Sequence, residues 1–335
     1  MNCTDLLAAI AVAGFVVASA STARAGDNAA ERAALLERAR QLEDLRSEDG
    51  SPFVLDAKIV ATKDKGHASG TYRLTWFAPN RWHEELKLAD FSRVRDGVDG
   101  GYRQIRSSDY QPPVIFDLDE MLDPAALARI GPKETVGKAH KERIGGVELS
   151  CVEILSKAYH HRELCFDPVT GLLVHATLGF GGPREFDYAR AVSLGTKQFP
   201  AEIKSQRKGD FSLEVSVQSL AASAADEASL PVPDPARSEF WGTCKDAVLP
   251  ELKQPVNPVY PQESKANHEE GTVLLYARIE SDGTVSHLLQ LSAPSASLAQ
   301  ASLDAVSRWK YTPEMCGNTP ETTETLIMVV FTLGN

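Results

Sequence analysis

Hydrophobic and polar residues alternate along most of the first two thirds of the chain. The stretch TYRLTW sets Tyr72, Leu74 and Trp76 against three polar or charged neighbours, and FSLEVSVQSL repeats this pattern over residues 211–220. A period of two is typical of half-buried antiparallel strands. Similar runs cover residues 53–61, 82–89, 147–155, 172–178 and 201–206. We therefore predict a many-stranded antiparallel sheet over residues 50–220, which curls into a half-barrel with one covered face.

Two stretches around this sheet have a helical pattern instead. Residues 26–49 are rich in Ala, Leu, Glu and Arg, and their apolar side chains recur on one helical face. We expect a helix that docks on the sheet. Residues 119–130 begin with acidic side chains and continue through an Ala- and Leu-rich segment, which predicts one helical insert.

The last third of the chain has its own pattern. Residues 221–238 are small, polar and interrupted by prolines, which is typical of a linker. Residues 239–335 contain an alternating strand, a tight turn at Asp282-Gly283, a returning strand, a helix with Leu298 on its apolar face, and a final apolar strand. We predict a small β-β-α-β domain, and for the whole chain an α+β fold.

The final strand is apolar on both faces. Only one face can pack on the helix, so the other needs a cover, such as another chain or the first domain. We predict that this strand is an edge strand that binds a partner, and its central residues are Leu326, Ile327, Met328, Val329, Val330 and Phe331.

Composition and charge narrow the classes of function. The formal net charge of the 335 residues is −11, which argues against nucleic acid and anionic lipid as the main partner. No phosphate-binding glycine loop and no nucleophile motif occurs in the sequence, so we expect no enzymatic activity and no cofactor. The pair His160-His161 fits a solvated loop better than a metal site, and no metal is predicted.

The N-terminus carries a targeting signal. Residues 6–20 are apolar, and Ala23-Arg24-Ala25 places small residues just before Gly26. This pattern predicts a cleaved signal peptide at residues 1–25, although no Lys or Arg precedes the apolar run. An uncleaved membrane anchor is the alternative, but fifteen apolar residues are fewer than the roughly 20 that a span requires.

Four cysteines remain after removal of the signal peptide. An even number in an exported chain favours disulfides. Their positions favour Cys151 with Cys165 and Cys244 with Cys316, one bond in each domain, and free buried thiols are the alternative for the first pair.

The C-terminal domain resembles the TonB C-terminal domain family. The motifs that carry the resemblance stand in family order over about 90 residues: Pro258-Val259-Tyr260-Pro261, Gly271-Thr272-Val273, Asp282-Gly283-Thr284-Val285, Trp309, Tyr311 and Pro313. The resemblance implies a periplasmic domain whose last strand pairs with a peptide of an outer-membrane transporter. The sequence departs from the energy-transducing members of the family, because it has no long Pro-rich spacer and no His in its N-terminal apolar segment.

The middle of the chain resembles the LolA-type lipoprotein-sorting fold. The resemblance covers residues 50–220 and rests on Gly70-Thr71-Tyr72, Ala78-Pro79-Asn80-Arg81-Trp82, Cys165-Phe166-Asp167 and Phe199-Pro200. It implies a hydrophobic concavity able to hold an acyl chain. The residues we predict to line this apolar cavity are Tyr72, Leu74, Trp76 and Trp82.

Together these features predict a periplasmic protein of the cell envelope, with an inner-membrane anchor facing the periplasm as the alternative. We expect the C-terminal domain to bind an outer-membrane protein or peptide by strand addition, or a second copy of the chain. The alternative function is a carrier of a lipid or lipoprotein acyl chain in the N-terminal sheet.

Overall fold

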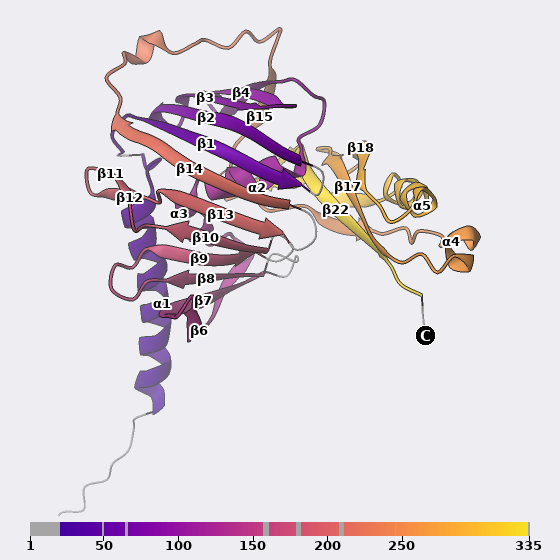
Figure 1. The fold of residues 1–335 in the computed structure, drawn as a ribbon, viewed down its shortest axis with the longest axis horizontal. Helices are drawn as coiled ribbons and strands as arrows, with labels where there is room; N and C mark the ends of the chain where they lie inside the picture. The colour runs from indigo at the N-terminus through magenta and orange to yellow at the C-terminus, as the bar shows by residue number, and fades with distance from the viewer. Residues whose placement is uncertain are drawn as a thin grey trace, which may run out of the picture.

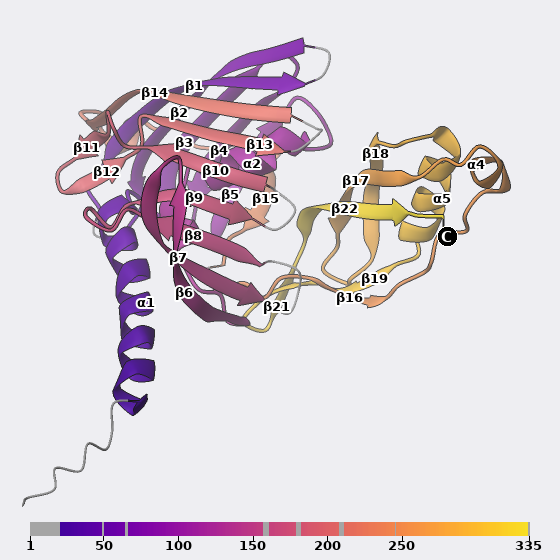
Figure 2. The same ribbon diagram turned by 60° about the horizontal axis from the view of Figure 1, so that its bottom comes forward.

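A computed structural model describes residues 21–48, 50–63, 66–156, 161–178, 182–207, 211–244 and 246–333 (Figure 1). A large curved sheet forms the N-terminal body, and a smaller α/β unit stands beside it (Figures 1 and 2). The α+β class and the curved antiparallel sheet predicted from the sequence are confirmed. Within the described part of the chain, no helix is long and apolar enough to cross a membrane. Residues 1–20 of the predicted signal peptide and His160 lie outside the described residues.

The large sheet contains 13 strands in the order β15-β5-β4-β3-β2-β1-β14-β13-β10-β9-β8-β7-β6. Every neighbouring pair is antiparallel. All seven strand regions inferred from alternation are strands, and the sheet also contains β4, β5, β6, β8, β10 and β15, which lie outside those seven regions. The strands are β1 (Phe53–Lys63), β2 (Gly66–Ala78), β3 (Arg81–Leu88), β4 (Ser92–Val98), β5 (Gly101–Arg106), β6 (Glu134–Ile144), β7 (Val147–Ser156), β8 (Arg162–Phe166), β9 (Leu173–Leu178), β10 (Gly182–Asp187), β13 (Glu202–Arg207), β14 (Phe211–Ala222) and β15 (Glu239–Gly242). A separate two-stranded sheet pairs β11 (Val192–Leu194) with β12 (Lys197–Phe199).

Three helices cover one face of the large sheet. The helix predicted at 26–49 is α1 (Ser21–Glu43), so it begins and ends about five residues earlier than predicted. Its first turns project beyond the sheet (Figures 1 and 2). Leu36 and Ala39 join the core that two short helices, α2 (Pro113–Met121) and α3 (Pro124–Leu127), share with strands from β1 to β14.

The single helical insert predicted at 119–130 is wrong. The structure has α2 (Pro113–Met121) and the one-turn α3 (Pro124–Leu127) instead. Pro124 cannot donate a backbone hydrogen bond and disfavours helical geometry at the residue before it, so α2 ends ahead of it. Asp123 then caps α3 by accepting a hydrogen bond from the backbone amide of Ala126 at 3.2 Å.

The C-terminal unit has the predicted β-β-α-β order. Its sheet runs β18-β17-β22, and α5 packs on one face through Leu298 and Val306. The turn between β17 and β18 needs Gly283, whose φ is +79°, because a Cβ at this position would lie 2.0 Å from the carbonyl oxygen of Tyr311. The elements are β16 (Glu251–Gln254), α4 (Gln262–Ala266), β17 (Gly271–Ile279), β18 (Val285–Ser292), α5 (Ala296–Val306), β19 (Lys310–Thr312), β20 (Glu314–Cys316), β21 (Thr319–Glu321) and β22 (Thr323–Phe331).

The segment between the two bodies is only partly a linker. After β14 ends at Ala222, the chain is irregular except for the 3₁₀ helix η2 (Glu227–Ser229). Residues 239–242, predicted to belong to the C-terminal domain, instead form β15 and extend the large sheet by pairing with β5. The chain thus adds an edge strand to the first body before it enters the second.

Candidate functional site

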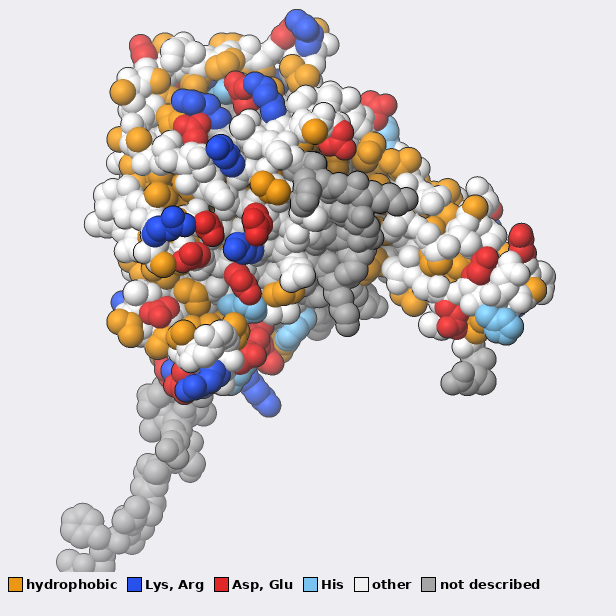
Figure 3. Space-filling model, viewed as in Figure 1, with side chains coloured by type: hydrophobic (Ala, Val, Ile, Leu, Met, Phe, Trp, Pro, Cys, Tyr) orange, Lys and Arg blue, Asp and Glu red, His pale blue; other side chains and the backbone are white. Residues whose placement is uncertain are grey.

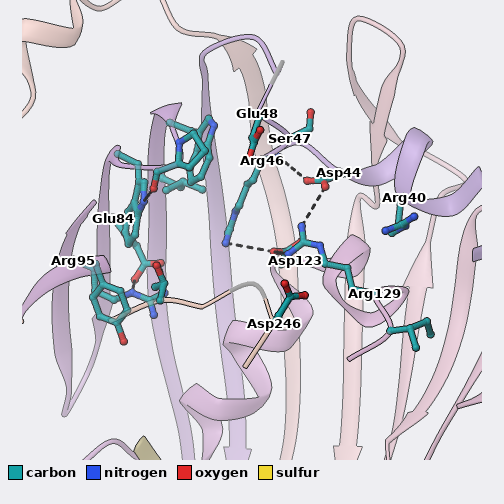
Figure 4. Close-up of a pocket in the computed structure, with 17 residues that line it drawn as sticks. Arg40, Asp44, Arg46, Ser47, Glu48, Glu84, Arg95, Asp123, Arg129 and Asp246 are labelled. Atoms are coloured by element: carbon teal, nitrogen blue, oxygen red, sulfur yellow. Dashed lines mark hydrogen bonds and ion pairs between the residues drawn. The ribbon is translucent and has the colours of Figure 1, made fainter. Parts of the chain in front are cut away.

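A cleft of about 730 Å³ opens at one end of the concave face of the large sheet (Figure 4). Its walls come from β2, β3, β4 and β5, from the end of α1 and the residues after it, from the residues on either side of α3, and from the segment that follows β15. Thr243 and Asp246 of that segment adjoin Cys244, so the approach to the C-terminal domain forms part of the wall. The described lining residues are Arg40, Asp44, Arg46, Ser47, Glu48, Leu74, Trp76, Pro79, Trp82, Glu84, Arg95, Tyr102, Asp123, Arg129, Ile130, Thr243 and Asp246.

One wall of the cleft is formed by the aromatic rings of Trp76, Trp82 and Tyr102, which come from β2, β3 and β5. Trp76 lies between Phe53 and Trp82, with ring centroids 6.4 Å and 6.3 Å away. Tyr102 continues the row at 6.0 Å from Trp82. Trp76 is 7% exposed, and its indole N–H has no acceptor within the described structure. This wall offers apolar contact together with one unused hydrogen-bond donor.

Beneath this wall lies a buried group of charges. Arg95 donates to both carboxylate oxygens of Glu84 at 2.7 and 2.5 Å, and Arg93 donates to Glu84 at 3.0 Å. Arg93 also pairs with Asp119 of α2 at 2.6 Å. Burial alone would raise the pKa of the Glu84 carboxyl, but the two arginines lower it to about 2. Glu84 is therefore ionised at neutral pH.

The opposite rim of the cleft is formed by paired charges (Figure 4). Arg46 lies 3.9 Å from Asp123 and donates to the carbonyl oxygen of Leu122 at 3.3 Å. Arg129 pairs with Asp44 at 3.1 Å and points toward Asp123 at 4.0 Å. The rim thus joins the end of α1 to α3 through ion pairs.

The predicted cavity residues lie at this cleft, but its lining differs from the expected apolar surface. Leu74, Trp76 and Trp82 line the cleft, whereas Tyr72 is buried below it and donates a hydrogen bond to Glu84 at 3.2 Å. More than half of the lining side chains are charged. Elsewhere on the concave face, the expected hollow is filled by the protein itself, because Ile115, Leu118 and other side chains of α2 pack into the core.

The sequence held a signal for the charged part of the cleft. Glu84 occupies a core-facing position in the alternation of β3, between Trp82 and Leu86. Arg93 and Arg95 occupy equivalent positions in β4, a strand that lies outside the predicted strand regions. Charged residues at buried positions usually mark a paired network, so the alternation of β3 already pointed to one.

The second candidate site is the last strand, β22. It pairs with β17 along its whole length, from Thr323 opposite Ile279 to Phe331 opposite Gly271. It stands at the end of the sheet order, so no described strand pairs with its other edge. Ile327, Val329 and Phe331 face α5 and are buried.

The other face of β22 is only partly covered. At its first residues, Glu324 accepts hydrogen bonds from Arg106 at 2.7 Å and from Tyr276 at 2.5 Å. This buried group docks the C-terminal sheet on the N-terminal body. Farther along the strand, Leu326 and Met328 are half-buried and Val330 is 64% exposed.

Both predicted disulfides are confirmed. Cys151 and Cys165 lie directly opposite each other on β7 and β8. Cys244 and Cys316 join the start of the C-terminal unit to β20. Each bond belongs to one of the two bodies, as the spacing of the cysteines indicated.

Comparison with known proteins identifies the C-terminal unit. Residues 256–333 match the family described as the Gram-negative bacterial TonB protein C-terminal, so this part of the chain is a TonB C-terminal domain. The solution structure of the Pseudomonas aeruginosa TonB C-terminal domain is 24% identical, covering 26% of this chain and 88% of that chain with a TM-score of 0.24. No curated protein matches the sequence.

The N-terminal body is similar to proteins of two other groups. A LolA superfamily protein from Nitrosomonas europaea is 11% identical, covering 58% of this chain and 94% of that chain with a TM-score of 0.40. A DUF1329 family protein from Desulfovibrio piger is 10% identical, covering 59% and 94% with a TM-score of 0.42. The TonB C-terminal domain and the two disulfides indicate a protein of the cell envelope.

Proposed function

We propose that this protein is a periplasmic adaptor that binds an outer-membrane transport partner by strand addition at β22. The observation that carries the proposal is a TonB C-terminal domain whose last strand has an open edge. An extended peptide that pairs there would gain main-chain hydrogen bonds, while its alternate side chains would contact the exposed apolar face of the strand. The same edge would accept β22 of a second copy. We propose a binding protein and not an enzyme, on the sequence grounds given above.

The exposed apolar face of β22 lies beside the open edge of the same strand, and this arrangement supports binding by strand addition. Val330 and Met328 lie beside the free edge, beyond the part of the strand that Glu324 docks on the N-terminal body. Unpaired edges with exposed apolar residues invite pairing with another chain. The docked end limits the surface that a peptide can reach to the second half of β22.

The test is a binding scan with peptides from the N-terminal segments of outer-membrane transporters, using the full chain with both disulfides intact. A peptide that binds is then N-methylated at one residue at a time. We expect affinity losses at every second residue, since only alternate amides of an added strand point toward β22. Losses without this period would contradict strand addition.

A matched pair of protein variants locates the peptide. Val330→Lys places a charge on the exposed face of β22 and should weaken binding about ten-fold. Val169→Lys makes the same change at an 80% exposed turn of the N-terminal body and should leave binding unchanged. Sedimentation of the free protein shows whether a second copy occupies the edge instead.

The cleft supports a second candidate function, the carrying of a lipid or lipoprotein acyl chain. Its volume lies within the range of small-molecule sites, and its aromatic wall is suited to an apolar chain. The paired charges of the rim would face a polar headgroup. Native mass spectrometry of the protein recovered from a bacterial envelope tests this: an added lipid mass that Trp82→Ala removes and Phe240→Ala retains would support the carrier. Recovery without added mass would count against it.

A further inference from the structure

A histidine and two glutamates converge on the convex face of the large sheet. His140 of β6 lies directly opposite Cys151 of β7, which lies directly opposite Cys165 of β8. Residues paired in this way point to the same face of a sheet. Glu142 is two residues beyond His140 on β6, and Glu163 is two residues before Cys165 on β8. Histidine and acidic side chains lie together over this part of the surface (Figure 3).

The distances between the donor atoms fit a single small ion. Nε2 of His140 lies 3.3 Å from a carboxylate oxygen of Glu163 and 3.8 Å from one of Glu142. Around a tetrahedral zinc ion with bonds of about 2.1 Å, ligand atoms stand roughly 3.3–3.5 Å apart. The sulfur of Cys151 also lies within 4.8 Å of these atoms, but its bond to Cys165 removes the thiolate that would bind a metal.

The electrostatics of the group favour an added cation. Burial raises the pKa of the Glu163 carboxyl, His140 opposes this, and contact with Glu142 raises the pKa further. Among the residues that the structure describes, no lysine or arginine forms an ion pair with either carboxylate. Two negative groups therefore share one imidazole, and a divalent ion between them would relieve their repulsion.

We propose that His140, Glu142 and Glu163 form a binding site for a divalent transition metal of the zinc class. One imidazole nitrogen and two carboxylate oxygens are ligands that zinc accepts, and water would complete the coordination. The simpler arrangement is an ion pair between a protonated His140 and Glu163 with no metal. The two arrangements predict different responses to added metal. A metal site should lose affinity when His140 is replaced and keep it when the nearby His175 is replaced, whereas an ion pair gives no such difference.

The test is a calorimetric titration of the full, disulfide-bonded protein with zinc in a chelator-free buffer. We expect one ion per chain with micromolar affinity, and about ten-fold or greater weakening by His140→Ala. His175→Ala is the matched control, because His175 lies opposite Cys165 on the next strand of the same face. It should bind zinc as the native chain does. Absence of binding to the native chain, or equal weakening by both variants, would overturn the proposal.

A second variant separates binding from folding. Glu163→Gln keeps the shape of the side chain and removes one charge, so the metal-free variant should melt at or above the temperature of the native chain. Zinc should raise the melting temperature of the native protein and leave that of Glu163→Gln unchanged. A rise of the same size in both would also overturn the proposal.

Discussion

Glu84 occupies a core-facing position of β3 that an apolar residue would normally fill. Both of its oxygens accept hydrogen bonds from arginines, and Arg93 beside it is 1% exposed. Loss of the negative charge would leave two buried guanidinium groups without their main partner. Buried ion pairs are costly to break from one side.

We therefore expect Glu84→Gln to lower the free energy of unfolding by about 3–5 kcal/mol at neutral pH. The folded-state pKa of Glu84, about 2, is below the ordinary value of 4.5, so this stabilisation is present above pH 4.5 and is lost as the pH falls toward 2. Urea unfolding of both proteins at several pH values should show the difference shrinking with acid. Glu85→Gln, on the opposite face of the same strand, should change stability by less than about 1 kcal/mol.

The pKa of Glu43, at the end of α1, is shifted in the opposite direction from that of Glu84. Burial raises the pKa of its carboxyl to about 8, although hydrogen bonds from Tyr188 at 2.6 Å and the amide of Leu173 at 2.8 Å oppose the rise. The folded protein therefore holds a proton here that the unfolded chain releases near pH 4.5.

The contribution of Glu43 to the free energy of unfolding should be fully present below pH 4.5. It should fall by roughly 3–5 kcal/mol as the pH rises toward 8. Glu43→Gln should abolish this fall and be more stable than the native chain at pH 9. Chemical unfolding of both proteins at pH 5, 7 and 9 measures this dependence of the free energy of unfolding on pH. Glu37→Gln, an exposed site on the same helix, should retain the native pH trend.

At the level of single residues, the apolar part of the cleft could be predicted from the sequence and the charged rim could not. Alternation along β2 and β3 placed Leu74, Trp76 and Trp82 on one face, and they line the cleft together. Arg46, Asp123 and Asp246 come from segments far apart in sequence that carry no periodic pattern. Only the fold brings them to one rim.

Among the elements, strands with a clear alternation of apolar and polar residues followed from the sequence, and these include β9 and β13 with six residues each. β1, β2 and β14 have enough residues for the period of two to be visible. β6 has 11 residues and was still missed, because most of its side chains are polar and none is buried, so its sequence shows no apolar face. The break between α2 and α3 depends on Pro124, and β15 has only four residues directly after the predicted linker, where no alternation can be seen.

The two disulfides close loops of different lengths, and their removal should differ accordingly. The cysteine positions are 72 residues apart for Cys244–Cys316 and 14 apart for Cys151–Cys165. In the chain-entropy description, the first stabilises by about 4 kcal/mol and the second by about 3 kcal/mol. Hydrogen exchange provides the measurement: Cys244→Ser/Cys316→Ser should expose amides of β17 and β22, while Cys151→Ser/Cys165→Ser should affect β7 and β8. Uniform exchange throughout both bodies would contradict this division.

For the whole molecule, the junction between the bodies is a set of specific contacts. Arg106 and Glu324 are both largely buried, and Tyr110 packs edge-on against Tyr276 with ring centroids 6.0 Å apart. Arg278 adds an ion pair with Glu239 of β15 at 3.0 Å. These contacts hold the TonB C-terminal domain against β5 and β15.

Arg106→Met should release the two bodies from each other, because Glu324 would lose the guanidinium that donates to both of its oxygens and would keep only the longer ion pair with Arg278 at 3.6 Å. We expect a larger radius of gyration in small-angle scattering and two separate thermal transitions. The control is Arg73→Met, which removes an exposed ion pair with Asp56 and should leave both measurements unchanged. A single native-like transition in Arg106→Met would show that other contacts suffice.

The Cys244–Cys316 bond also sets the route of a mechanical load through the molecule. If a partner strand pulls on β22, tension along the main chain passes from Thr323 back to Cys316 and crosses the sulfur bridge to Cys244. From there it reaches β15 and its pairing with β5. The 71 residues between the two cysteines, including β17 and α5, lie on a covalently bypassed branch, since 316 − 244 − 1 = 71. Under extension they can lose their packing on β22 without adding length, so the molecule would act as a short tether.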